Sequence, residues 1–152
     1  MNAIRRIMVA VDFSEISKKL VGYALALAQK CDAEVHLVHV INQRDIEAIR
    51  KVAEVTSAIS LPEQIEARRE DLLAALMAIL SELAVDPEAI GRHVTTGVPY
   101  EALISAIKEM DIDLFIMGTR GRGKFAGMLF GSTAAQMLHK CPVPLLTLRN
   151  DA

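Results

Sequence analysis

The chain has 152 residues, 52% of them hydrophobic and 24% charged, which is typical of a compact globular protein and excludes a disordered one. Its net charge of −2 excludes a general attraction to nucleic acid or to anionic membranes. Apolar runs of about nine residues are too short to cross a bilayer, and the N-terminus is typical of a strand rather than a signal peptide. We therefore expect a cytoplasmic protein with a single domain over residues 1–152.

Strands and helices alternate along the chain. Short β-rich apolar runs predict strands at 6–11, 33–41, 89–97, 113–118 and 143–149. Helical spacing and helix-start signals predict helices at 15–31, 62–84, 99–110 and 131–140. Such an order predicts an α/β fold, an open five-stranded parallel sheet with helices on both faces. Pro142 and Pro144 cannot donate to a strand ladder, so we expect the last strand at an edge of the sheet.

Three local features of the helices can also be predicted. Ser14 is a good N-cap for the helix at 15–31, and Ser60 with Glu63 resembles a capping box before the helix at 62–84. Residues 42–61 have only partial helical spacing, so we expect a variable segment there, mobile or partly helical. The side chains expected to face the core from the helix at 62–84 are Ile65, Leu72, Leu76, Ile79 and Leu83.

Cysteine and histidine spacing gives no metal motif. Cys31 and Cys141 are far apart with no CxxC, so we expect reduced, buried thiols. His36 and His39 fall on opposite faces of a predicted strand, which argues against a metal site that they share. Together with His93 and His139 they form no pattern such as HExxH, and we interpret all four as core or surface histidines.

The segment MGTRGRGKFAGMLFGSTAAQML, residues 117–138, is rich in glycine and basic residues and has no acid. A locally positive loop of this kind suits an anion. A Walker A motif would need a hydroxyl after Lys124, where Phe125 stands. The loose dinucleotide fingerprint from Gly121 to Ala126 lacks an acid about twenty residues further on. Neither motif therefore accounts for the loop.

The spacing G-x2-G-x9-G-[ST] does match, at Gly118, Gly121, Gly131 and Ser132. Here the chain resembles the universal stress protein family, specifically its ATP-binding branch. The resemblance spans the chain, through VAVDFSE, VHLVHV, the glycine segment and the closing CPVPLLTLR. It implies a Rossmann-like fold, similar to the adenine nucleotide α-hydrolases, with strand order 3-2-1-4-5.

The glycine motif suits phosphate on physical grounds. Gly118 and Gly121 let the backbone approach an anion and can adopt φ > 0. Gly131, Ser132 and Thr133 begin a helix, whose free N–H groups, hydroxyls and positive dipole end favour phosphate. The alternative is that these glycines have only a structural role, in a turn followed by a helix cap.

Basic side chains of the same loop add to this expectation. Arg120 could make a charge-assisted contact with phosphate. Arg122 and Lys124 either do the same or are simply solvated. The loop is thus the predicted phosphate-binding element.

The resemblance also implies roles for residues at the ends of the first, second and fourth strands. Asp12 would lie near the ribose or the phosphates, with Ala10 and Val11 beside the base. Val40 would meet the adenine through its backbone, and Met117 would line the pocket. The alternatives are a turn or helix-capping role for Asp12 and ordinary core roles for Val40 and Met117.

By resemblance the protein binds ATP, or AMP or ADP, with Mg²⁺, and acts as a regulatory homodimer in the stress response. The family pairs through its last strand, here Val143–Leu148. Two alternatives stay open: a module that binds an unknown protein partner without nucleotide, and a slow ATPase. Catalysis is disfavoured because Asp12 is the one obvious acid and has no clear base beside it. Nucleic-acid binding is disfavoured because the loop lacks aromatic platforms.

Overall fold

The computed structural model describes residues 2–56, 59–119 and 130–149, and its five parallel strands form one sheet of order β3-β2-β1-β4-β5. The strands are β1 (Arg6–Ala10), β2 (Glu34–Asn42), β3 (Gly91–Gly97), β4 (Leu114–Gly118) and β5 (Leu145–Leu148). The helices are α1 (Ser17–Cys31), α2 (Gln43–Val55), α3 (Leu61–Glu82), α4 (Pro99–Glu109) and α5 (Ser132–Lys140), with a 3-10 turn, η1 (Pro87–Ala89). The predicted sheet, its strand order and the edge position of the last strand are confirmed.

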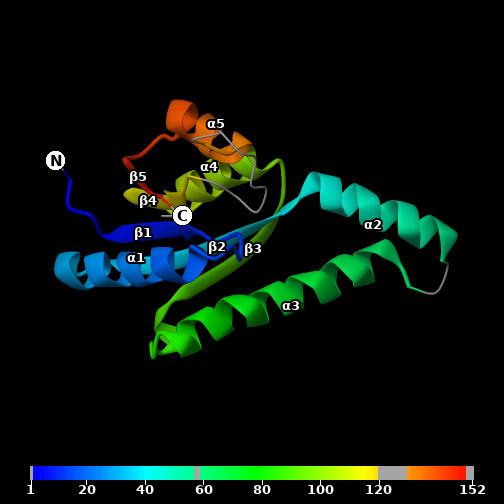
Figure 1. The fold of residues 1–152 in the computed structure, drawn as a ribbon, viewed down its shortest axis with the longest axis horizontal. Helices are drawn as coiled ribbons and strands as arrows, with labels where there is room; N and C mark the ends of the chain where they lie inside the picture. The colour runs from blue at the N-terminus through cyan, green and yellow to red at the C-terminus, as the bar shows by residue number, and fades with distance from the viewer. Residues whose placement is uncertain (1, 57–58, 120–129, 150–152) are drawn as a thin grey trace.

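Helices cover both faces of the sheet (Figure 1). Helices α1 and α3 pack on the face that contains Ile7, Leu37 and Ile116. Helices α4 and α5 pack on the opposite face, which contains Met8 and Phe115. Because side chains alternate between two buried faces, strands β1 and β4 are apolar in consecutive positions, and this is why they appear in the sequence as unbroken apolar runs.

The strand order reverses direction between β1 and β4. From β1 the chain builds outward through β2 to β3, and then returns to add β4 and β5 on the other side. Residues Ile7–Val9 pair with Leu114–Ile116 across this junction. In open parallel sheets such a switch point leaves a crevice beyond the carboxyl ends of the two strands.

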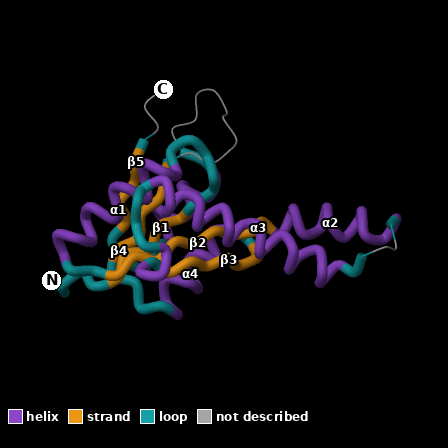
Figure 2. The backbone as a smooth tube through the Cα atoms, turned by 90° about the horizontal axis from the view of Figure 1, so that it is seen from below, coloured by secondary structure: helices purple, strands orange, loops and turns teal. Residues whose placement is uncertain are grey.

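Helix α2 forms where the sequence showed only partial helical spacing. With α3 it makes a hairpin that extends beyond the sheet (Figure 2). The Asn42 side chain caps α2 by accepting a hydrogen bond from the Arg44 N–H at 3.1 Å. None of the residues of α2, all of them described, is buried. The weak pattern has a physical reason, since α2 packs beside α3 rather than on the sheet.

One local expectation is wrong, and another is confirmed only in part. Helix α1 begins at Ser17, with Ile16 as its N-cap, so Ser14 is not the cap. The buried stripe of α3 is Leu72, Leu76 and Leu80, whereas Ile79 is only partly buried. The i, i+4 spacing of these leucines follows one helix face more closely than the expected stripe did.

The two cysteines are free thiols, but they are not both buried as expected. Cys31 is exposed at the end of α1, and Cys141 is partly buried after α5. Burial raises the pKa of Cys141, against a smaller lowering by the backbone hydrogen bond at Val143. Among the helices that the structure describes, none combines the length and the apolar character that crossing a membrane requires.

The α3 stripe provides a test of the core. Leu76 is fully buried, whereas the next residue, Met77, is 37% exposed. We expect Leu76→Ala to lower the free energy of unfolding by about 2–5 kcal/mol, because it leaves a cavity, and Met77→Ala to lower it by much less. Urea unfolding followed by circular dichroism measures both. Equal losses in the two variants would contradict the assigned packing of α3.

Candidate functional site

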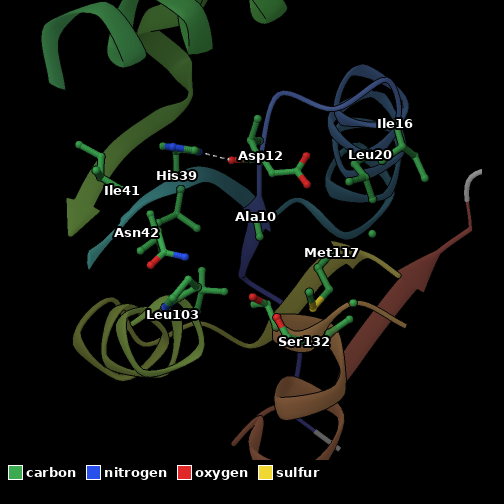
Figure 3. A pocket seen from close by; sticks show the side chains of 18 of the residues that line it. Ala10, Asp12, Ile16, Leu20, His39, Ile41, Asn42, Leu103, Met117 and Ser132 are labelled. Atoms are coloured by element: carbon green, nitrogen blue, oxygen red, sulfur yellow. Dashed lines mark hydrogen bonds between the residues drawn. The ribbon is translucent and has the colours of Figure 1, made fainter. Parts of the chain in front are cut away.

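A cavity of about 480 Å³ opens at the carboxyl ends of the strands, at the switch point (Figure 3). This volume is in the usual range for small-molecule sites, roughly 300–1,000 Å³. The site residues predicted from sequence that line it are Ala10, Val11, Asp12, Val40, Met117, Gly118, Gly131, Ser132 and Thr133. Arg120 and Gly121, and the basic residues Arg122 and Lys124, lie outside the described residues.

The start of α5 forms one wall of the cavity. Gly131 is the N-cap and has no side chain with which to accept a hydrogen bond. The N–H groups of the first turn of a helix have no intrahelical acceptors, and here they belong to Ser132, Thr133 and Ala134. These donors, two hydroxyls and the positive end of the helix dipole therefore meet at one cavity wall, where a negative charge is stabilised.

A short hydrogen bond holds this wall against the sheet. The N–H of Gly131 donates to the carbonyl oxygen of Thr119 at 2.8 Å, and the N–H of Thr119 donates to Leu148 of β5 at 3.1 Å. Thr119 itself is buried. The residue after β4 and the N-cap of α5 are thus joined directly, which fixes where the helix N-terminus points.

Gly118 does not use the positive φ that the sequence suggested. It is the last residue of β4, in register with Leu148 of β5. Among the glycines that the structure describes, the one with a positive φ is Gly97, at 140°. At the cavity wall Gly118 therefore contributes an extended backbone without a side chain.

Asp12 shapes the turn between β1 and α1 while it lines the cavity. Its Oδ1 atom accepts hydrogen bonds from the Ser14 N–H at 2.9 Å and from the Ser17 hydroxyl at 3.2 Å. Phe13 between them has φ 60°, a left-handed conformation that is rare for a bulky residue. The turn role that the sequence left open for Asp12 is therefore present, in the same residue that faces the cavity.

His39 is a cavity residue that sequence reasoning missed. Its Nδ1 atom lies 2.7 Å from the carbonyl oxygen of Val11 (Figure 3). Because a carbonyl only accepts, Nδ1 carries a proton, and in the neutral ring Nε2 is an acceptor. The ring packs against Phe13, with centroids 4.9 Å apart. The available signal was its place beside Val40, at the carboxyl end of β2.

Other residues of the cavity lining come from helices and strand ends in which the sequence showed no binding motif. Apolar side chains from α1, α3 and α4 form part of the walls, and three polar residues add to the lining from the end of β2 and from α2 and α3. The apolar residues are Ile16, Leu20, Leu72 and Leu103, and the polar ones are Asn42, Asp45 and Arg68. Sequence spacing could not identify them, because they meet only after α1, α3 and α4 pack on the sheet and α2 packs beside α3.

Comparisons with known proteins agree with this architecture. The model of the universal stress protein family matches residues 3–149. The stress response protein NhaX of Bacillus subtilis is 26% identical, with 95% of this chain and 97% of that protein covered. The universal stress protein MJ0577 of Methanocaldococcus jannaschii is 23% identical over 95% of this chain and 94% of its own.

Solved structures show the same fold. That of MJ0577 superposes with a TM-score of 0.80 at 21% identity and covers 99% of both chains. A universal stress protein in complex with cAMP gives a TM-score of 0.66 at 19% identity, with 97% of this chain and 98% of that one covered. The family match over almost the whole length, the strand order and the cavity at the switch point agree, and the chain belongs to the universal stress protein family.

Proposed function

We propose that the protein binds an adenine nucleotide, ATP in the first place, in the cavity at the switch point, and that it acts as a regulatory protein in the stress response. The observation that carries this proposal is the open N-terminus of α5 at the cavity wall. Three N–H donors without intrahelical acceptors are a ready site for phosphate. AMP and ADP would use the same site.

The lining fits such a ligand part by part. Phosphates would meet the first turn of α5 at Ser132 and Thr133. The base would lie over the ends of β1 and β2, beside Val11 and Val40, where apolar side chains and backbone groups alternate. Asp12, which also lines the cavity, would contact the ribose or the phosphates. The universal stress protein solved with cAMP supports a ligand of the adenine nucleotide class.

Regulation by binding accounts for the site better than catalysis does. The carboxylates among the described lining residues are Asp12 and Asp45. One oxygen of Asp12 already accepts two hydrogen bonds within its turn, and the Nδ1–H of His39 is held by Val11. These contacts give both side chains a structural role at the end of β1. We place the protein in the cytoplasm, in agreement with an exposed free thiol at Cys31.

The N-cap of α5 gives a direct test of nucleotide binding. We expect Gly131→Val to weaken ATP binding at least tenfold, about 1.4 kcal/mol, because a branched side chain would fill the approach to the helix N–H groups. Calorimetric titration with ATP and Mg²⁺ measures the affinity. Ala135→Val is the matched control, since Ala135 is exposed on the same helix and is absent from the cavity lining. An unchanged affinity in Gly131→Val would mean that the site is wrongly assigned.

Substitution of Asp12 tests whether the protein only binds ATP or also hydrolyses it slowly. At saturating ATP we expect the same trace rate of phosphate release from wild type and from Asp12→Ala, because the hydrogen bonds of this carboxylate to Ser14 and Ser17 give it a structural role in the turn. Ser17→Ala is the control, because it also removes the Asp12–Ser17 hydrogen bond but keeps the carboxylate. A rate that drops tenfold in Asp12→Ala and persists in Ser17→Ala would favour the ATPase instead.

We further propose that two copies pair through the last strand, within Val143–Leu148. Strand β5 lies at an edge of the sheet, and its four residues, LLTL, carry no charge. All four are partly exposed. An apolar edge strand with unpaired backbone groups favours association unless it is covered or charged.

A single charge should separate the copies. We expect a dimer at micromolar concentration in sedimentation experiments, and a monomer for Thr147→Lys, because a lysine guards an edge strand against pairing. The control is Thr96→Lys, an exposed position on the opposite edge strand, β3. A wild-type monomer, or equal dissociation of both variants, would contradict pairing through β5.

A further inference from the structure

A pair of histidines joins β2 to the edge strand β3. The Nδ1 atom of His36 lies 3.1 Å from the Nε2 atom of His93. His36 is in register with Gly91, and His93 with Val38, so both side chains lie on the sheet face that α4 and α5 cover. Both residues stand near the amino ends of their strands. Neither histidine lines the cavity, although Val38, which is in register with His93, does.

We propose that His36 and His93 form a binding site for a divalent transition-metal ion of the zinc type, with His36 Nδ1 and His93 Nε2 as its ligands. Imidazole nitrogens bind Zn²⁺ at roughly 2.0–2.1 Å, so two of them 3.1 Å apart subtend an angle of about 100° at one ion. That angle lies between the octahedral and tetrahedral values. The spacing of the two nitrogens is thus already that of neighbouring ligands.

Gly91 lets the His36 ring, with its Nδ1 atom, pack closely against the backbone of β3. A Cβ atom at this position would overlap His36 Nδ1 and would lie 3.0 Å from His93 Nε2. The backbone does not explain the glycine, since Gly97 is the glycine with a positive φ in this strand. Glycine also weakens a strand interior. Its presence here is explained by the His36 ring, which a larger residue at position 91 would push away from His93.

A carboxylate lies near the far side of the His36 ring, just beyond hydrogen-bond distance. His36 Nε2 is buried and has no hydrogen-bond partner among the described residues. The Glu34 carboxylate oxygen Oε2 is 3.6 Å from it, and Arg6 Nε is 3.5 Å from the same oxygen. A histidine that binds metal through Nδ1 carries its proton on Nε2 and commonly donates it to a carboxylate. A small movement of the exposed Glu34 side chain would complete this contact.

The protonation of the pair is compatible with a metal ligand. Two neutral imidazoles in contact share one hydrogen between Nδ1 and Nε2, and a bound ion would take the place of that hydrogen. Burial, and then the neighbouring His36, lower the pKa of His93.

The chemistry of the ligands limits which ion fits and how tightly. Imidazole nitrogen suits Zn²⁺, Cu²⁺ and Ni²⁺, whereas Mg²⁺ and Ca²⁺ prefer oxygen. Within the described ranges no cluster of three or more His, Cys, Asp or Glu could hold a metal. Water would therefore complete the coordination, and binding would be weaker than at a closed four-ligand site. The ion would tie β3 to β2 and stabilise this edge of the sheet.

Zinc alone is the probe for the test. Tag-free protein is stripped with EDTA, transferred to metal-free buffer and titrated with ZnCl₂ in a calorimeter. We expect one Zn²⁺ per chain and a higher Tm with Zn²⁺ than with EDTA. His36→Gln and His93→Gln should each weaken binding at least tenfold and abolish the Tm shift. His139→Gln, at an exposed position on α5, is the matched control and should bind as wild type does.

Gly91→Ala tests the geometry without removing a ligand. We expect it to weaken Zn²⁺ binding at least tenfold, because its methyl group displaces the His36 ring. Should a variant fold poorly, ¹⁵N spectra of the wild-type imidazoles give the answer alone, since Zn²⁺ should shift the signals of His36 and His93. Absence of Zn²⁺ binding by wild type, wild-type affinity in His93→Gln or Gly91→Ala, or shifts confined to other histidines would overturn the proposal.

Discussion

Burial of both faces of the parallel sheet is the constraint on which the other features depend. Parallel strands need crossover helices, and here α1 and α3 cover one face while α4 and α5 cover the other. Polar groups of the sheet that could contact a ligand are therefore confined to the ends of the strands and to the sheet edges. The cavity occupies the carboxyl ends at the switch point, where a helix N-terminus also points. The fold thus determines where a ligand can bind before any side chain determines which ligand binds.

The strands could be predicted from the sequence because their pattern is local. Features that depend on tertiary packing could not be predicted in this way. Runs such as RIMVA need only their own residues to indicate a buried strand. Ser14 was expected to cap α1, but Asp12 two residues earlier holds the turn and moves the start of the helix to Ser17. Leu80 replaced Ile79 in the buried stripe because α3 meets the sheet at a rotation that periodicity alone does not fix.

The sequence could predict the parts of the cavity lining that lie at the strand ends or in the glycine motif. Residues at the ends of β1, β2 and β4 and at the start of α5 could be identified from the sequence, because parallel strands bring their carboxyl ends together. For His39 the sequence offered only its place beside Val40, at the carboxyl end of β2. Arg68 could not be identified, because it comes from the middle of α3. The pair of His36 and His93 could not be identified either, since spacing along the chain says nothing about contacts between neighbouring strands.

The two edges of the sheet differ in a way that bears on assembly. Strand β3 presents Arg92, which is paired with Glu88 at 3.7 Å, and the imidazole of His93. Strand β5 presents only leucines and Thr147. Charged or strongly polar groups protect an edge against pairing with another strand, and an uncharged edge lacks this protection. Since the same sheet guards one edge and not the other, the unguarded edge is the one that needs a covering partner, and this asymmetry supports pairing through β5.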